Sequence, residues 1–208
     1  MTRIFFFTLI LATAFFAGCG FRSGNQAAGN AESPAPTPPL PSAPSPTPDS
    51  TPEETAGKSA TLQCQSVNTG DYKVYKKQTF AIDFEPFRNS CFVTSHSPEY
   101  EDPPMESQIA IYKGGKKVFD FPSQFNGVNF GCWVEAAAFQ DLNEDKLTDV
   151  IVVSKCQAKS DSYNENTVYV NTGKSLTTRD DANISLSDKR SVKEVADFVK
   201  ENRTMFFN

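Results

Sequence analysis

The sequence contains little of what hydrolases and transferases need. It has a single histidine, His96, in 208 residues, and it lacks a G-x-S-x-G elbow, an H-E-x-x-H pair, a phosphate loop and a dinucleotide fingerprint. His96 stands among serines at the end of a predicted strand, where a lone histidine is typical of a surface turn rather than of a catalytic base. We therefore expect a protein that is not an enzyme. A glycosidase built from two separated carboxylates stays open, because it would leave no local motif.

Positive charge is also in the minority. The chain has 20 Lys and Arg residues against 25 Asp and Glu residues, which gives a net charge of −5. Lysines gather at residues 73–77 and 113–117, but in polar, turn-like surroundings that indicate a solvated surface. Because a nucleic-acid partner requires a basic face, we expect none.

Long apolar runs are scarce, and the one near the start is short. Residues 4–16 are mostly apolar and follow Arg3, whereas a helix that spans a bilayer needs roughly 20 apolar residues. This pattern predicts a signal peptide over residues 1–18, and therefore an exported protein.

The residues that follow are Ala17, Gly18 and Cys19, and they resemble the lipobox of bacterial lipoprotein precursors. Phe16 stands where that family prefers Leu. The resemblance implies a lipid on Cys19 and membrane attachment through that anchor, since each buried methylene contributes about 0.8 kcal/mol. Gly20 in place of Asp favours the outer membrane or cell surface, with the periplasmic side as the alternative. An ordinary signal peptide cut near Ala17, leaving Cys19 as a free thiol, is the competing interpretation.

Residues 19–59 are rich in Pro, Ser, Ala and Thr and poor in large apolar residues, which predicts a disordered tether. Nine of the 14 prolines lie between Pro34 and Pro52. An extended polyproline-like form of that stretch would reach roughly 60 Å. A proline-rich ligand for an aromatic groove is the less favoured alternative.

The remaining residues, 60–208, predict one globular domain. It contains four widely spaced cysteines without a C-x-x-C pair, which in an exported chain predicts two disulfides. Cys132 and Cys156 lie on either side of a predicted turn and are the favoured pair, which leaves Cys64 with Cys91.

Segments rich in branched and aromatic residues predict strands at residues 79–84, 91–94, 108–112, 134–139, 150–153 and 168–170. Gly114 and Gly115 between apolar arms predict a hairpin. Ser191 and Glu194 form a capping-box pattern ahead of an amphipathic helix of about ten residues. The tail at residues 205–207 is expected to pack against the body. The predicted fold class is mainly β, with antiparallel strands, hairpins and a C-terminal α-helix; α+β is the alternative.

One segment has metal-binding character. Residues 141–149 place carboxylate or amide oxygens at positions 1, 3, 5 and 9 of a short loop, which suits a hard cation such as calcium. An EF-hand would need Glu at position 12, but Val152 stands there within a predicted buried strand. The EF-hand is therefore excluded.

With its flanking strands, over about residues 134–173, this loop resembles a single FG-GAP or VCBS-type repeat of the kind found in bacterial surface proteins. A full propeller is excluded by length. The resemblance implies calcium ligands at Asp141, Asn143, Asp145, Leu147 (through its carbonyl) and Asp149. Position 6 of the family is usually Gly, whereas Lys146 stands here, at a cost of about 1 kcal/mol in a left-handed backbone. The alternative is an Asp-rich turn that keeps the shape without binding metal.

Together these patterns favour a lipid-anchored surface or periplasmic protein whose domain is a calcium-stabilised binding or scaffolding module. Its ligand would be a protein or a glycan. The alternatives are a periplasmic enzyme or enzyme inhibitor, and a purely structural envelope protein.

Overall fold

The computed structural model describes residues 52–128 and 130–207. The predicted signal peptide, Cys19 and most of the predicted tether lie outside the described residues. The first described element is helix α1 (Pro52–Cys64), so residues 52–59, which we expected to be tether, belong to a helix. Composition misled this prediction, because proline at a first helical position followed by acidic residues also favours a helix start.

The described residues form two five-stranded antiparallel sheets. The first has the order β1-β3-β4-β5 with β2 also paired to β3, and the second has the order β10-β9-β7-β6 with β8 also paired to β7. The first sheet contains β1 (Lys73–Val74), β2 (Phe80–Phe84), β3 (Phe87–His96), β4 (Gln108–Lys113) and β5 (Lys116–Asp120). The second contains β6 (Cys132–Gln140), β7 (Asp149–Gln157), β8 (Ser162–Asn164), β9 (Thr167–Asn171) and β10 (Leu176–Thr178).

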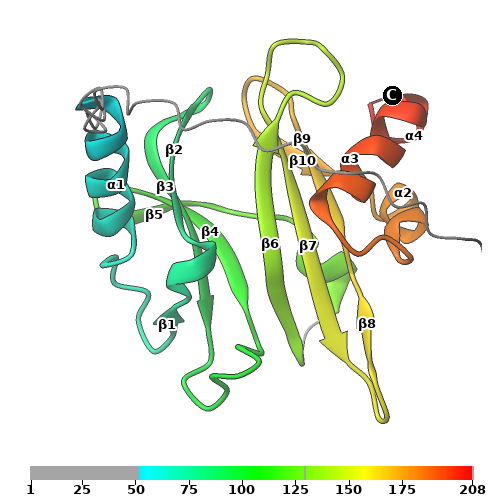
Figure 1. The fold of residues 1–208 in the computed structure, drawn as a ribbon, viewed down its shortest axis with the longest axis horizontal. Coiled ribbons are helices and arrows are strands. Elements are labelled where there is room, and N and C mark those ends of the chain that lie inside the picture. The colour runs from blue at the N-terminus through cyan, green and yellow to red at the C-terminus, as the bar shows by residue number, and fades with distance from the viewer. Residues whose placement is uncertain (1–51, 129, 208) are drawn as a thin grey trace, which may run out of the picture. The chain divides into compact units, whose positions relative to one another are not determined.

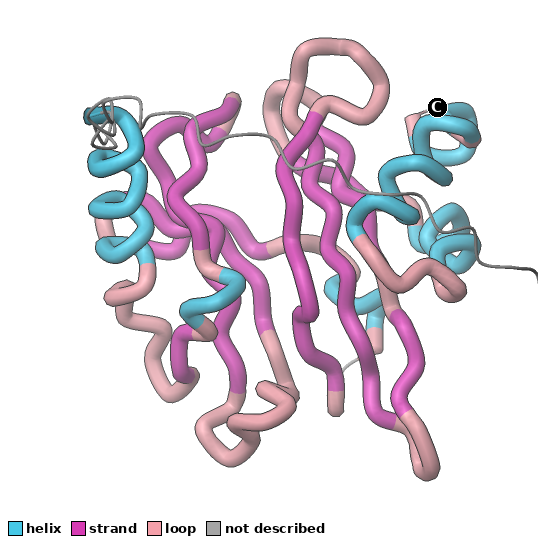
Figure 2. The backbone as a smooth tube through the Cα atoms, viewed as in Figure 1, coloured by secondary structure: helices cyan, strands magenta, loops and turns pink. Residues whose placement is uncertain are grey.

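Helices cover the outer faces of this sandwich, with α1 beside the first sheet and the C-terminal helices beside the second (Figures 1 and 2). The C-terminal group consists of α2 (Asp180–Asn183), η3 (Ile184–Leu186), α3 (Val192–Glu201) and α4 (Arg203–Phe206). Two further 3₁₀ turns are η1 (Lys76–Gln78) and η2 (Gln124–Gly127). The fold is thus mainly antiparallel β with a C-terminal helix, as the sequence predicts.

Alternation along β7 explains the two apolar layers, since successive side chains of a strand point to opposite faces. Val150 and Val152 face the first sheet, whereas Ile151 and Val153 face the helices. The first layer is aromatic, with Phe92, Phe121 and Tyr169 fully or almost fully buried. The second layer takes side chains from the helices, chiefly Leu186, Val195, Val199 and Phe206.

The predicted hairpin and helix are both confirmed. Gly114 and Gly115 have φ angles of +58° and +77° in the turn between β4 and β5. At the start of α3, Ser191 Oγ accepts a hydrogen bond from the amide of Glu194, and the Glu194 carboxylate accepts one from the amide of Arg190. Phe206 packs against the body, as expected for the tail.

Two disulfides join the cysteines in the favoured pairing. Cys132 and Cys156 are direct partners in the β6–β7 ladder, and Cys64 of α1 bonds to Cys91 of β3. Leu62 of α1 is 67% exposed, and Cys64 is the one side chain of residues 57–64 that is buried. The disulfide therefore attaches this helix to β3 through its one buried side chain among residues 57–64.

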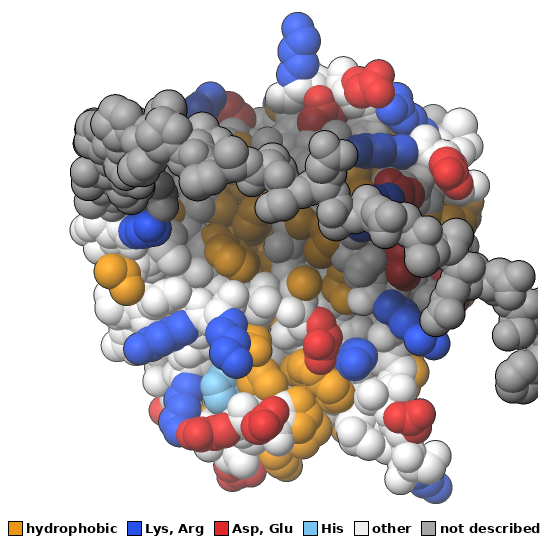
Figure 3. Space-filling model, viewed as in Figure 1, with side chains coloured by type: hydrophobic (Ala, Val, Ile, Leu, Met, Phe, Trp, Pro, Cys, Tyr) orange, Lys and Arg blue, Asp and Glu red, His pale blue; other side chains and the backbone are white. Residues whose placement is uncertain are grey.

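Charged side chains of both signs are interspersed on the face shown in Figure 3. Among the described residues, no helix combines the length and the apolar character that a bilayer-spanning segment requires.

Candidate functional site

The acidic loop connects β6 to β7, and Asp141 organises its first half. Asp141 Oδ1 accepts a hydrogen bond from the amide of Glu144 at 2.6 Å, and Oδ2 accepts one from the amide of Lys146 at 2.8 Å. Desolvation opposes ionisation here, but these amide hydrogen bonds prevail and hold the pKa of Asp141 below its usual value. Asp141 is therefore ionised at neutral pH.

Asn143 and Asp145 are brought together in the same loop. Asn143 Nδ2 donates to Asp145 Oδ2 at 2.9 Å, and Asn143 Oδ1 accepts from the amide of Asp145 at 3.2 Å. Asp145 Oδ1 in turn accepts from the amide of Leu147 at 2.8 Å. Three of the predicted ligand side chains thus share one tightly curled turn.

The backbone of the loop is left-handed at two positions. Lys146 has a φ of +70° and Glu144 a φ of +69°. Arg203 of α4 fixes the outer side, with its guanidinium 2.6 Å from Glu144 Oε1 and 3.4 Å from the carbonyl of Asn143. The hydrogen bond and the charge of Arg203 lower the pKa of Glu144.

Asp149, the predicted ligand at position 9, lies at the base of the loop and is fully buried. Its Oδ2 accepts from the amide of Leu142 at 3.0 Å and its Oδ1 from the amide of Asn171 at 2.8 Å. No described cation pairs with it. Burial raises the pKa of Asp149 to about 6, and the negative charges of Asp145 and Asp141 add to this effect.

These observations test whether calcium fits the loop. No three His, Cys, Asp or Glu side chains of the described residues are grouped closely enough to hold a metal ion. The predicted set, however, includes an amide and a backbone carbonyl, and its donors are all oxygen, as calcium prefers. Asp149 is a buried carboxylate without a cationic partner. The negative charges of Asp145 and Asp141 lie close enough to raise its pKa further. The oxygen donors and the buried carboxylate of Asp149 are thus of the chemical kind that calcium ligands have, but they do not form a metal-binding group in this structure.

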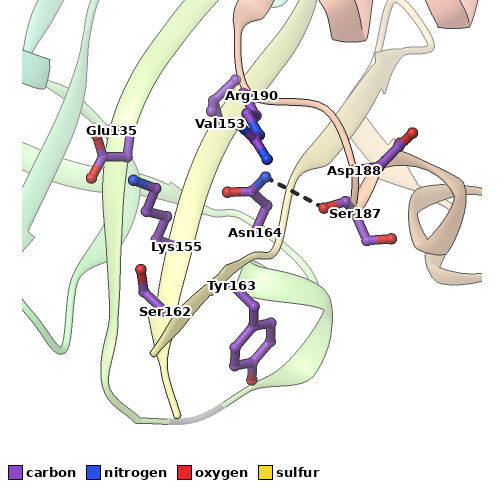
Figure 4. Close-up of a pocket in the computed structure, with 9 residues that line it drawn as sticks. All are labelled: Glu135, Val153, Lys155, Ser162, Tyr163, Asn164, Ser187, Asp188 and Arg190. Atoms are coloured by element: carbon purple, nitrogen blue, oxygen red, sulfur yellow. Dashed lines mark hydrogen bonds between the residues drawn. The ribbon is translucent and has the colours of Figure 1, made fainter. Parts of the chain in front are cut away.

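A separate pocket lies on the helix-facing side of the second sheet (Figure 4). Its volume is about 430 Å³. Val153 and Lys155 of β7 form its floor, with Glu135 of β6 and Asn164 of β8 beside them. The wall comes from the segment between η3 and α3. Its lining residues there are Ser187, Asp188 and Arg190, and Ser162 and Tyr163 of β8 complete the lining.

A β-bulge brings Glu135 into this pocket. The pairing of β6 with β7 shifts between Val134, which pairs with Ser154, and Ala136, which pairs with Val153. Glu135 is the extra residue, and such a residue is re-aimed by the local bend. Its carboxylate accepts a hydrogen bond from the indole N–H of Trp133, the register partner of Lys155.

Two asparagines hold the wall of the pocket in place. Asn164 Nδ2 donates to the carbonyls of Ser187 at 3.3 Å and Lys189 at 2.8 Å. Buried Asn166 donates from its side-chain amide to the carbonyls of Leu186 and Lys189, both at 2.8 Å. Because buried or half-buried amides make these bonds, the pocket is preformed rather than assembled by a ligand.

Sequence reasoning missed this pocket. Its charged residues lie between positions 135 and 190, and no local motif links them.

His96 does not line this pocket. It lies on β3 and is 6% exposed. Its Nδ1 is 2.7 Å from the carbonyl of Tyr100 and 2.9 Å from that of Ser97. The expectation of an exposed turn histidine is therefore wrong, because these carbonyls and the ring of Tyr75 enclose it.

Comparison of the chain with protein-family models, with curated proteins and with solved structures finds no match.

Proposed function

We propose that this chain is an exported lipoprotein, anchored by an acylated Cys19, whose folded domain is a calcium-stabilised binding module at the end of a proline-rich tether. The two disulfides support the export, because such bonds form and persist in oxidising compartments. The partner is a protein or a glycan, and not a nucleic acid, since basic and acidic groups are interspersed on the face in Figure 3.

The observation that carries the binding function is the pocket beside β7. It is preformed, concave and of the size of ligand sites, which measure roughly 300 to 1,000 Å³. Lys155 and Arg190 line it, and neither forms an ion pair with a described residue. Cationic groups held in a cavity without a partner favour a ligand of opposite charge.

The proposed calcium ion has a structural role. It would be held by the side chains of Asp141, Asn143, Asp145 and Asp149 and by the carbonyl of Leu147, in keeping with the resemblance to FG-GAP or VCBS-type repeats. The ion would compensate the buried charge of Asp149 and would join the ends of β6 and β7.

The binding is proposed to leave the ligand unchanged. Neither histidine nor cysteine lines the pocket. Of its two carboxylates, Glu135 accepts the indole N–H of Trp133 and Asp188 is paired with Lys189. A ligand recovered intact after prolonged incubation with the protein supports this proposal. Conversion of the ligand, abolished by Glu135→Gln, would instead establish an enzyme.

Fractionation of cells tests the anchor. We expect wild-type protein in the membrane fraction and Cys19→Ser in the soluble fraction, because the substitution removes the sulfur that would carry the lipid. Ser23→Ala, four residues further on, is the matched control and should remain with the membrane. Membrane association of Cys19→Ser, or mass spectrometry that shows an unmodified chain beginning at Met1, would refute the lipoprotein assignment.

A further inference from the structure

We infer that the pocket beside β7 binds a small carboxylic acid that also carries hydroxyl groups, such as a sugar acid. This inference rests on the proposed binding function and narrows its ligand to the glycan class, with an acidic sugar as the unit that the pocket recognises. It depends on which charges in the pocket are already neutralised and which are not.

Four charged side chains line the pocket. Asp188 is paired with Lys189 at 2.8 Å, so its charge is already matched. Lys155 and Arg190 have no ion-pair partner among the described residues, and Glu135 accepts only the neutral indole N–H of Trp133. Two unmatched positive charges and one unmatched negative charge leave a net charge of about +1. This balance suits the single charge of a carboxylate better than the −1.5 to −2 of a phosphate group near neutral pH.

The placement of these groups divides the pocket into two sides. Figure 4 shows the Arg190 guanidinium above the Asn164 side chain on one side, and the Lys155 ammonium directed toward Glu135 on the other. Arginine presents a planar fork that matches a carboxylate. We therefore assign the ligand carboxylate to the Arg190 side.

Glu135 and Lys155 favour a ligand that carries hydroxyl groups. Its carboxylate has more acceptor capacity than one indole donor can satisfy, and Lys155 is not within ion-pair distance of it. Ligand hydroxyl groups would donate to Glu135 and accept from Lys155. Ser162 and Ser187 line the same cavity and can also pair with hydroxyl groups.

The test uses the whole chain purified in detergent and three probes: glucuronate, glucose and inorganic phosphate. Trp133 is the only tryptophan and is hydrogen-bonded to Glu135, so its fluorescence reports on the pocket. We expect a saturable fluorescence change with glucuronate and binding that is at least about tenfold weaker with glucose, which lacks the carboxylate. No response to glucuronate, or phosphate binding as tight as glucuronate binding, would overturn the assignment.

Two substitutions locate the response. Arg190→Gln and Lys155→Gln should each weaken glucuronate binding about tenfold, because each removes one cationic hydrogen-bond donor. Arg88→Gln and Lys113→Gln, at residues that do not line the pocket, are the matched controls and should bind as the wild type does. Arg190 is exposed, so its substitution should not change folding, which the melting curve of each variant checks. Unchanged binding by both pocket variants would place the ligand elsewhere.

This test is independent of the anchor. If fractionation contradicts the lipoprotein assignment, the glucuronate titration still decides the ligand class. If glucuronate does not bind but Cys19→Ser becomes soluble, the lipoprotein assignment is supported and the assignment of a carboxylate ligand is refuted.

Discussion

The amide of Asn171 donates a hydrogen bond to Asp149 Oδ1 at 2.8 Å and thereby connects the last residue of β9 to the base of the acidic loop. The Asn171 side chain extends this connection. Its Nδ2 donates to the carbonyl of Thr148 at 3.0 Å and to the carbonyl of Glu85 at 2.6 Å, in the turn that links β2 to β3. One buried asparagine thus joins the acidic loop to both sheets.

Removing this side chain should be costly. Asn171→Ala removes the donor of two part-buried carbonyls, and at about 0.5 to 1.5 kcal/mol for each hydrogen bond the loss is about 1 to 3 kcal/mol. We expect a loss of that size in the free energy of unfolding measured by urea denaturation. Asn68→Ala, at an exposed position with one local hydrogen bond, should change it by less than about 0.5 kcal/mol. Equal effects of the two substitutions would refute the role of Asn171.

Chelation tests the proposed calcium ion. Because a ligand that binds only the folded state stabilises it, adding a chelator to protein purified with calcium should lower the melting temperature, and restoring calcium should raise it. Asp145→Ala should lower the melting temperature in calcium and should remove the response to chelator. Asp161→Ala, in a different loop, should retain the response. A wild-type melting curve that chelator does not change would refute the calcium assignment.

The pKa of Asp149 predicts how stability depends on pH once calcium is removed. Burial raises this pKa from 3.8 to about 6, so the folded state binds the proton more tightly than the unfolded state. The resulting stabilisation is complete below the unfolded value and is lost as pH rises through about 6. In chelator, the contribution of Asp149 to the free energy of unfolding should therefore fall by about 2 kcal/mol between pH 4 and pH 7.

A substitution isolates this contribution from those of other groups. Asp149→Asn cannot titrate, so the difference in unfolding free energy between it and the wild type should change with pH over the window from about 4 to 7. The difference between Asp161→Asn and the wild type should vary much less over the same range. A wild-type profile that runs parallel to that of Asp149→Asn would contradict the raised pKa.

The elements that the sequence predicts well are those with local chemical signals. Gly114 and Gly115 favour a hairpin turn through their own backbone conformations, which do not depend on distant residues. Ser191 and Glu194 cap α3 through contacts within one helical turn. The three-residue strands β8 and β10 have no such signal. They are strands because β7 and β9 present free edges to them.

The pocket could not be predicted for a related reason. Glu135 reaches it through a bulge, and Arg190 reaches it because Asn164 and Asn166 hold the preceding residues against the second sheet. Both effects depend on tertiary hydrogen bonds between residues far apart in the chain. The acidic loop, in contrast, lies within nine consecutive residues, and local hydrogen bonds place Asp141, Asn143 and Asp145 in one turn.

Lys146 has a strained backbone conformation, and a substitution that relieves the strain should raise the free energy of unfolding. With φ at +70°, its Cβ is crowded in a way that costs an ordinary L-residue about 1 to 2 kcal/mol. Lys146→Gly should raise the free energy of unfolding by about 0.5 to 1 kcal/mol, since the greater entropy of glycine in the unfolded chain offsets part of the gain. Lys146→Ala keeps the Cβ and should give no gain. Equal effects of Gly and Ala would show that side-chain contacts, not backbone strain, decide this position.

Helix α1 depends on the disulfide that joins Cys64 to Cys91. In the described part of this helix the side chains are mostly exposed, and Cys64 alone is buried, so apolar packing contributes little to its attachment. Removing both sulfurs with Cys64→Ala and Cys91→Ala should let α1 detach while the two sheets keep their packed layers.

Limited trypsin digestion measures this detachment through cleavage after Lys58. We expect the double variant to be cut at Lys58 much faster than the wild type, while far-UV circular dichroism still shows the β-sheet signal. Cys132→Ala with Cys156→Ala is the matched control, because the two disulfides close loops of similar length, with sequence separations of 24 and 27 residues. Removing either disulfide should therefore lower the free energy of unfolding by about 3.5 kcal/mol through the entropy of the unfolded chain. The two variants then differ only in where the disulfide lies in the fold. Faster cleavage at Lys58 in the control as well would mean that global stability, rather than the local tether to β3, protects α1.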